Sequence, residues 1–254
     1  MRDQGKAQKT YRHRISHWPL IPKSESLSSL FRHPVSSISI PLDAERRPRH
    51  ACTVLIKICG ICHPRDAEAA IEAGADLLGF IFVEGTPRAL EASKTQWIRN
   101  LCGAATVGVF RDAPLDRILE IQDSLDLDWV QLHGSEPDDW LEVLGPRVIR
   151  RVPVPPSGVD RPRVEALNHH GFLPLVDPGA GDGDTCDWQA LAQRLDGLKF
   201  GLAGGLTPET VGKAIRIARP TMVDVSSGVE RAPRIKDHAK IQAFVQTSRS
   251  AATT

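Results

Sequence analysis

Short apolar runs alternate with longer amphipathic stretches from residue 53 onward. The runs are rich in Val, Ile and Leu, and the stretches between them carry helix start signals such as Pro64-Arg65-Asp66 and Thr207-Pro208-Glu209. Eight strand–helix units in about 195 residues favour a (β/α)8 TIM barrel. An open doubly wound sheet is the alternative, but no Gly-x-Gly-x-x-Gly follows the first strand. The predicted strands are Thr53–Ile58, Asp76–Phe82, Ala105–Phe110, Asp128–Leu132, Arg147–Val152, Phe172–Asp177, Leu198–Ala203 and Met222–Ser226.

Side chains able to exchange protons stand at the predicted ends of two distant strands. Cys59 follows the first strand, and Asp177 closes the sixth. Because the carboxyl ends of all strands meet at one face of a barrel, we expect these side chains to share a site. A thiol and a carboxylate can serve there as base and acid. Lys57, on the same strand face as Cys59, is the candidate cation for lowering the pKa of the thiol.

Glycine-containing turns follow the last two predicted strands, at Gly204-Gly205 and at Ser226-Ser227-Gly228. Glycines let backbone N–H groups approach an anion closely, and helix N-termini add positive partial charge. These are the two loops at which barrels often bind phosphate. The pair of turns therefore predicts a phosphate site.

The ordered motifs along the barrel resemble the phosphoribosylanthranilate isomerase family over about residues 54–246. The motifs that carry the resemblance are Lys57-Ile58-Cys59-Gly60-Ile61, Gly74-Ala75-Asp76, Gly79-Phe80-Ile81-Phe82, Pro87-Arg88, Val107-Gly108-Val109-Phe110, Val130-Gln131-Leu132-His133-Gly134, Asp187-Trp188, Gly204-Gly205-Leu206-Thr207-Pro208-Glu209, Val223-Asp224-Val225-Ser226-Ser227-Gly228-Val229-Glu230 and Lys236-Asp237.

The resemblance implies an Amadori rearrangement of a small phosphosugar, N-(5-phosphoribosyl)anthranilate, in tryptophan biosynthesis. It implies that Cys59 is the general base, that Asp177 is the general acid, and that Arg88 contacts the anthranilate part. The reaction needs no electron sink beyond its own iminium, so we expect no metal and no organic cofactor. The chain is expected to act as a monomer or homodimer. The implied phosphate-site residues are Gly204, Gly205, Ser226, Ser227 and Gly228, with Gly181 and Gly183 of the sixth loop closing nearby.

Four positions depart from the family pattern. Ala180, Cys186, Ala203 and Arg234 stand where Gly, Phe, Ser and Gly are usual. None of these changes removes a catalytic group. They bear on loop shape, and they leave open a relative with an altered substrate.

Two other functions compete with the isomerase. Another barrel acting on ribulose phosphates, such as a pentose-phosphate epimerase, typically uses a pair of carboxylates rather than a thiol and a carboxylate. A phosphate-ligand sensor or nucleic-acid-binding protein would use the basic N-terminal segment. The Cys59-Gly60-Ile61-Cys62 spacing lacks the second Cys/His pair of a zinc site.

Charge divides the chain into two predicted parts. Residues 1–50 carry 10 Lys and Arg against 4 Asp and Glu, and lack a helical or alternating apolar period. We expect a basic, disordered extension over 1–50 and a catalytic barrel over 51–250. A transit peptide is the alternative for the extension. Five cysteines without a secretory h-region indicate a reducing compartment, so a cytoplasmic location is expected. No membrane span and no nucleic-acid partner are expected.

Removal of residues 1–48 is expected to leave the melting temperature and turnover nearly unchanged, because a segment of this composition buries little apolar area. Thermal unfolding and activity of the shortened and full-length chains test this expectation. A large loss of stability would show instead that the extension docks on the barrel.

Overall fold

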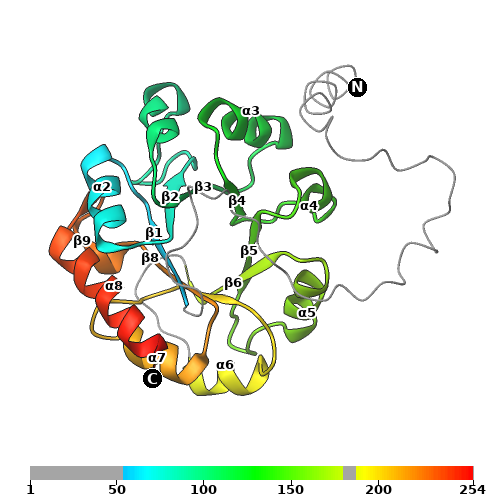
Figure 1. The fold of residues 1–254 in the computed structure, drawn as a ribbon. Coiled ribbons are helices and arrows are strands. Elements are labelled where there is room, and N and C mark those ends of the chain that lie inside the picture. The colour runs from blue at the N-terminus through cyan, green and yellow to red at the C-terminus, as the bar shows by residue number, and fades with distance from the viewer. Residues whose placement is uncertain (1–53, 180–186, 254) are drawn as a thin grey trace, which may run out of the picture. The chain divides into compact units, whose positions relative to one another are not determined.

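The computed structural model describes residues 54–179 and 187–253. The predicted extension over 1–50, together with Gly181 and Gly183, lies outside these residues. Eight parallel strands form a closed barrel in which each strand pairs with the next and β8 pairs with β1 (Figure 1). The predicted (β/α)8 barrel is thereby confirmed. The strands are β1 (Leu55–Cys59), β2 (Leu77–Ile81), β3 (Ala105–Phe110), β4 (Trp129–Leu132), β5 (Val148–Pro153), β6 (Leu173–Asp177), β7 (Gly201–Leu202) and β8 (Met222–Val225).

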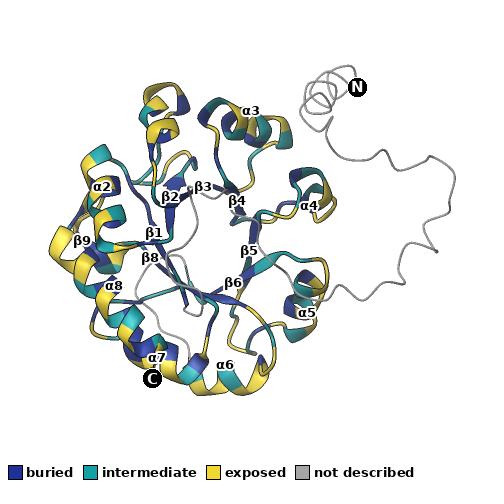
Figure 2. Ribbon diagram, in the orientation of Figure 1, coloured by how far each residue is buried: buried dark blue, intermediate teal, exposed yellow. Residues whose placement is uncertain are grey.

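Helices surround the strands, and their outward faces are exposed whereas the strands are buried (Figure 2). Several begin at a side-chain cap: Asp187 accepts hydrogen bonds from two backbone N–H groups at the start of α6, and Asp237 does the same for α8. The helices are α2 (Pro64–Ala73), α3 (Leu115–Leu125), α4 (Asp139–Leu144), α5 (Arg161–His169), α6 (Trp188–Arg194), α7 (Val211–Ala218) and α8 (His238–Ala252).

Two apolar layers follow from the alternation of side chains along each strand. Ile56 and Ile58 belong to the layer between strands and helices. The inner layer fills the barrel and consists of Leu55, Leu77, Ala105, Val107, Trp129, Ile149, Leu173, Leu175, Ala203 and Met222.

Inward-facing positions change from apolar to polar toward the carboxyl ends of the strands. In β1 the inner-layer residue Leu55 is followed two residues later by Lys57, which is fully buried. In β6 Leu175 is followed by Asp177. The same step, from Trp129 to Gln131 and from Met222 to Asp224, occurs in β4 and β8. The barrel is therefore apolar at one end and carries buried polar groups at the other.

Local structure departs from the predicted pattern in two places. Short 3-10 helices, η1 (Ala92–Lys94) and η2 (Gln96–Asn100), stand between β2 and β3 in place of an α-helix. The helix expected at Thr207 begins instead at Val211, and the carbonyl of Thr207 accepts hydrogen bonds from the backbone N–H groups of Thr210 and Val211. The Thr207–Thr210 segment is thus a turn that precedes the helix.

An antiparallel hairpin that the sequence pattern did not predict follows η3 (Ser227–Val229). It consists of β9 (Glu230–Ala232) and β10 (Ile235–Lys236). Arg234, in the turn between them, has a φ of 73°. A non-glycine residue in a sparsely populated backbone conformation costs on the order of 1–3 kcal/mol and persists only where its surroundings hold it.

Among residues 54–179 and 187–253, no helix combines the length and apolar character needed to cross a membrane.

Candidate active site

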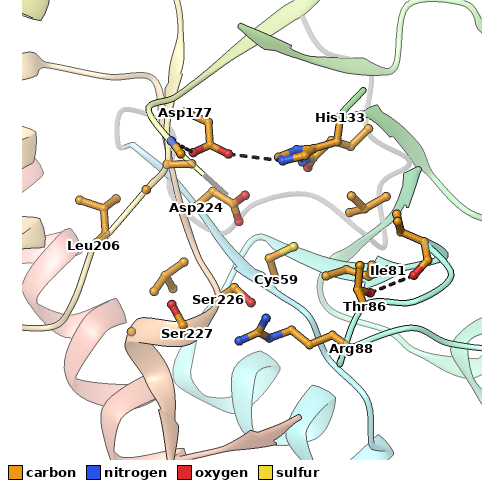
Figure 3. A pocket seen from close by; sticks show the side chains of 18 of the residues that line it. Cys59, Ile81, Thr86, Arg88, His133, Asp177, Leu206, Asp224, Ser226 and Ser227 are labelled. Carbon is orange, nitrogen blue, oxygen red and sulfur yellow. Dashed lines mark hydrogen bonds and ion pairs between the residues drawn. The ribbon is translucent and has the colours of Figure 1, made fainter. Parts of the chain in front are cut away.

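One pocket at the carboxyl ends of the strands is lined by every predicted site residue that the structure describes (Figure 3). Cys59 and Asp177 come from β1 and β6, and Arg88 comes from the segment after β2. Gly181 and Gly183 lie outside the described residues, so their placement stays a prediction. The remaining predicted residues on the pocket wall are Gly204, Gly205, Ser226, Ser227 and Gly228.

Cys59 shares its surroundings with a buried ion pair. Lys57 is fully buried, and its Nζ donates to both carboxylate oxygens of Asp224, at 3.0 and 3.1 Å. Gly79 makes room for these groups: a Cβ there would lie 2.7 Å from the Cys59 sulfur and 2.9 Å from Lys57 Nζ. The thiol and the ammonium therefore occupy neighbouring space that a larger residue at position 79 would fill.

Burial outweighs the cation in setting the pKa of the thiol. Desolvation raises the pKa of Cys59 above its ordinary value, and the neighbouring Lys57 lowers it by less. For Lys57, burial lowers the pKa, but Asp224 and Cys59 together raise it above the usual range. The prediction that Lys57 lowers the pKa of Cys59 below its usual value is therefore wrong in its net result. The free protein holds Cys59 as a thiol at neutral pH, beside a lysine that remains charged.

Asp177 lies in surroundings suited to a carboxylic acid. Burial raises its pKa above the ordinary value, while the backbone N–H of Gly179, 3.2 Å from Oδ1, and the Arg151 guanidinium act in the opposite direction. Arg151 Nε lies 3.5 Å from Oδ2. Because the raised pKa increases the protonated fraction near neutral pH, Asp177 can donate a proton to a bound ligand.

His133 faces Asp177 as a neutral ring. Its Nε2 lies 3.4 Å from Asp177 Oδ2 (Figure 3). Burial and then the charge of Arg151 lower the pKa of His133 to about 3. Gln131 Nε2, only 3.0 Å away, donates to Nδ1, which places the ring proton on Nε2 toward the carboxylate. Gln131 thus orients the His133 ring beside the Asp177 carboxylate.

The glycine-containing loops after β7 and β8 touch each other at the pocket wall. A Cβ on Gly228 would lie 1.9 Å from the Leu206 carbonyl oxygen, so only glycine fits there. Gly204 has a φ of 86°, and a Cβ there would lie 2.6 Å from Pro178. The loops after β7 and β8 are thus in close contact beside Ser226 and Ser227.

Gly228→Ala is expected to weaken phosphate binding by at least about tenfold, because the added methyl group forces apart the two loops that the sequence predicts as the phosphate site. Titration of wild type and variant with inorganic phosphate measures the effect. Gly145→Ala is the control for backbone strain alone, because Gly145 caps α4 at φ 78°, does not line the pocket, and a Cβ there meets no neighbouring atom within 4 Å. Unchanged phosphate affinity in Gly228→Ala would contradict the assignment.

Two arginines contribute positive charge to the pocket wall. Arg88 is 22% exposed and forms a paired contact with Glu230, with Nε 2.8 Å from Oε1 and Nη2 2.6 Å from Oε2. Within the described part of the chain, Arg88 Nη1 has no hydrogen-bond partner. Arg111 also lines the pocket, is exposed, and is close enough to His133 to lower its pKa. The pocket therefore presents cations able to meet an anionic ligand.

Several residues of the site were absent from the sequence-based assignment. Arg111 directly follows β3, so the rule that strand ends converge on one face could have identified it. Asp224 lies inside β8, lines the pocket and pairs with Lys57. Glu230 stands in a motif that carries the resemblance, but nothing in the sequence indicated its pairing with Arg88, 142 residues away. Within the described ranges, no three His, Cys, Asp or Glu side chains gather as a metal site.

Comparison with known proteins identifies one family. The model of N-(5'-phosphoribosyl)anthranilate isomerase matches residues 56–247. The isomerase of Geotalea daltonii is 42% identical over 203 residues, covering 76% of this chain and 96% of its own. The isomerase of Saccharomyces cerevisiae is 36% identical, covering 77% and 94%. A crystal structure of the Thermotoga maritima isomerase superposes with a TM-score of 0.70 at 36% identity, covering 78% of this chain and all of that one.

Proposed function

Because the chain belongs to the N-(5'-phosphoribosyl)anthranilate isomerase family, we propose that it catalyses the Amadori rearrangement of N-(5-phosphoribosyl)anthranilate to 1-(2-carboxyphenylamino)-1-deoxyribulose 5-phosphate. The reaction needs an acid at the furanose ring oxygen and a base at C2′. Asp177 and Cys59 are the proposed acid and base. The observation that carries the proposal is that both line the pocket formed by the two glycine-containing loops.

Ring opening is the step assigned to Asp177. Its proton goes to the ring oxygen, the C1′–O bond breaks with its electron pair on that oxygen, and the anthranilate nitrogen forms an iminium with C1′. The raised pKa of Asp177 supports this role, because a carboxyl that ionises fully at neutral pH would hold no proton to donate. His133 and Gly179 hold the carboxyl in place without taking the proton.

Removal of the C2′ proton is the step assigned to Cys59. The thiolate accepts this proton, and the C–H electron pair forms the enolamine double bond as the iminium is neutralised. The thiol must first ionise, and two positive charges favour the thiolate: Lys57 beside it and the iminium of the ring-opened substrate. The enolamine then gains a proton at C1′, and the hydroxyl at C2′ loses its proton, which gives the ketone.

Substrate binding is assigned to two groups of residues on the pocket wall. The phosphate lies on the Gly204, Gly205 and Ser226–Gly228 loops, whose peptide groups suit an anion. The anthranilate carboxylate lies against Arg88, whose Nη1 is available beside the contact to Glu230. One solved relative, 35% identical, is a complex with reduced 1-(o-carboxyphenylamino)-1-deoxyribulose 5-phosphate. A ligand of that kind carries both anionic groups.

A direct assay tests the proposed function. Purified protein is mixed with N-(5-phosphoribosyl)anthranilate, loss of substrate fluorescence is followed, and the product is identified by NMR. We expect the 1-amino-1-deoxyketose. Turnover of ribulose 5-phosphate without turnover of the anthranilate compound would support an epimerase-type barrel instead and would overturn the proposal.

The pH dependence of kcat/KM is expected to be a plateau with two limbs. Between the two pKa values most of the protein carries the Cys59 thiol and the ionised Asp177. The productive form, with Cys59 thiolate and protonated Asp177, holds the same number of protons, so its fraction does not change with pH in this range. Activity falls below the raised pKa of Asp177, where both groups are protonated, and above the raised pKa of Cys59, where both are ionised. The pH profiles of kcat/KM for wild type and Asp177→Asn test this. A high-pH limb that begins near neutral pH in the wild type would contradict the raised pKa of Cys59.

A solved relative and the N-terminal segment bear on oligomeric state and location. One solved relative concerns a dimeric Thermotoga maritima isomerase and monomers derived from it. We propose a monomer or homodimer for this chain, with a cytoplasmic location or, if residues 1–50 are a transit peptide, an organellar one. Sedimentation of the purified chain and microscopy of a tagged chain test the two statements.

A further inference from the structure

We propose that the β9–β10 hairpin positions Arg88 for the anthranilate carboxylate, with Glu230 and Arg234 as positioning residues that set substrate affinity. The inference rests on the proposed function, in which Arg88 contacts that carboxylate. Neither Glu230 nor Arg234 lines the pocket. Glu230 contacts the side chain of Arg88, and Arg234 contacts the backbone on either side of Arg88.

Glu230 determines which edge of the Arg88 guanidinium faces the ligand. The carboxylate accepts hydrogen bonds from Nε and Nη2, at 2.8 and 2.6 Å, in the paired geometry that fixes the plane of a guanidinium. The Nη1 edge remains for a second anion. Without Glu230, Arg88 would sample several side-chain rotamers, and binding would require ordering it.

Arg234 holds the backbone on both sides of Arg88. Its Nη1 donates to the carbonyl oxygens of Pro87, at 2.7 Å, and Ala89, at 3.2 Å. These two carbonyls flank Arg88 in the chain, so the Arg234 side chain holds residues 87–89 in place. The left-handed conformation of Arg234, at φ 73°, occurs in the hairpin turn that directs the side chain to this segment.

Lys236 connects the hairpin to the phosphate end of the pocket. It is buried, and its Nζ donates to Glu230 Oε1 at 3.0 Å and to the Ser226 carbonyl at 2.9 Å. Ser226 belongs to the loop assigned to phosphate. Lys236 thus ties Glu230, the partner of Arg88, to the backbone of the loop assigned to phosphate.

Loss of the Arg234 contacts is expected to weaken substrate binding and leave the chemical step unchanged. Arg234 touches neither Cys59 nor Asp177 in the described contacts, so its loss affects ground state and transition state alike. Such a change raises KM with kcat unchanged. Two hydrogen bonds from a charged donor lead us to expect a five- to tenfold rise in KM for Arg234→Ala.

The experiment compares Arg234→Ala with Arg231→Ala, which removes an exposed arginine from the same hairpin and should leave KM unchanged. KM and kcat are measured for N-(5-phosphoribosyl)anthranilate, and Kd for the reduced product analogue. Arg234→Gly is included because glycine tolerates the left-handed turn; it should be at least as stable as wild type yet show the same rise in KM and Kd. A wild-type KM in both Arg234 variants would overturn the inference.

A double-mutant cycle shows whether Arg234 acts through Arg88. In an Arg88→Ala background, Arg234→Ala should change Kd for the analogue by less than twofold. An undiminished effect of Arg234→Ala in that background would overturn the positioning role. Failure of wild type to convert the substrate would overturn the proposed function alone, because the Kd values of the analogue still decide whether Arg234 positions Arg88.

Discussion

Asp177→Asn is expected to lower kcat by at least about 10²-fold while the barrel stays folded, because the amide cannot donate the proton that opens the furanose ring. The change is isosteric, and the amide can still accept from the Gly179 N–H at the position of Oδ1. Steady-state kinetics measures the loss, and circular dichroism with thermal unfolding verifies the fold.

Asp196→Asn is the matched control, since Asp196 is an exposed aspartate after α6. Near-normal turnover in a correctly folded Asp177→Asn protein would show that Asp177 is a turn residue before Pro178. A shift in KM alone would assign it to substrate binding.

Cys59→Ser is expected to lower kcat by about 10²-fold or more, because a serine hydroxyl is a far weaker base than a thiolate in the same position. The buried ion pair of Lys57 and Asp224 remains, so the loss should appear in kcat with little change in stability. Kinetics of the purified variant gives the size of the effect.

The exposed Cys102 provides the control variant Cys102→Ser, which removes a thiol far along the chain from the proposed base. Activity within a few-fold of wild type in Cys59→Ser would mean that the Cys59 thiol only packs against its neighbours. Another group would then have to remove the C2′ proton.

The barrel and the meeting of Cys59 and Asp177 at one pocket were predictable from the sequence because both depend on where strands end. Cys59 and Asp177 follow apolar runs, and parallel strands bring such ends to one face. The predicted strand positions overlap all eight observed strands, and only β7 is much shorter than expected.

Pairing between distant residues was not predictable. Lys57 meets Asp224 because β1 and β8 close the barrel with these two residues in register. Arg88 meets Glu230 because a hairpin of five strand residues folds back on the segment after β2. Neither contact leaves a periodic signal in the chain.

The pKa of Cys59 shows a second limit of sequence reasoning. The sequence correctly placed a cation two residues away, yet the direction of the shift depends on how much solvent the fold removes. Desolvation opposes the charged form of the thiol, and its size follows from burial in the completed barrel. The net effect could be judged only with Lys57, Asp224 and the surrounding strands in place.

The roles of Cys59 and Asp177 are tested most directly by the isotope effect of deuterium at C2′ of the substrate, measured on kcat for Cys59→Ser and Asp177→Asn. Weakening the base should make C–H cleavage rate-limiting, so Cys59→Ser should show a primary isotope effect. Weakening the acid should make ring opening rate-limiting, so Asp177→Asn should show an effect near one. The reverse pattern, or equal effects in the two variants, would contradict the assignment of base and acid.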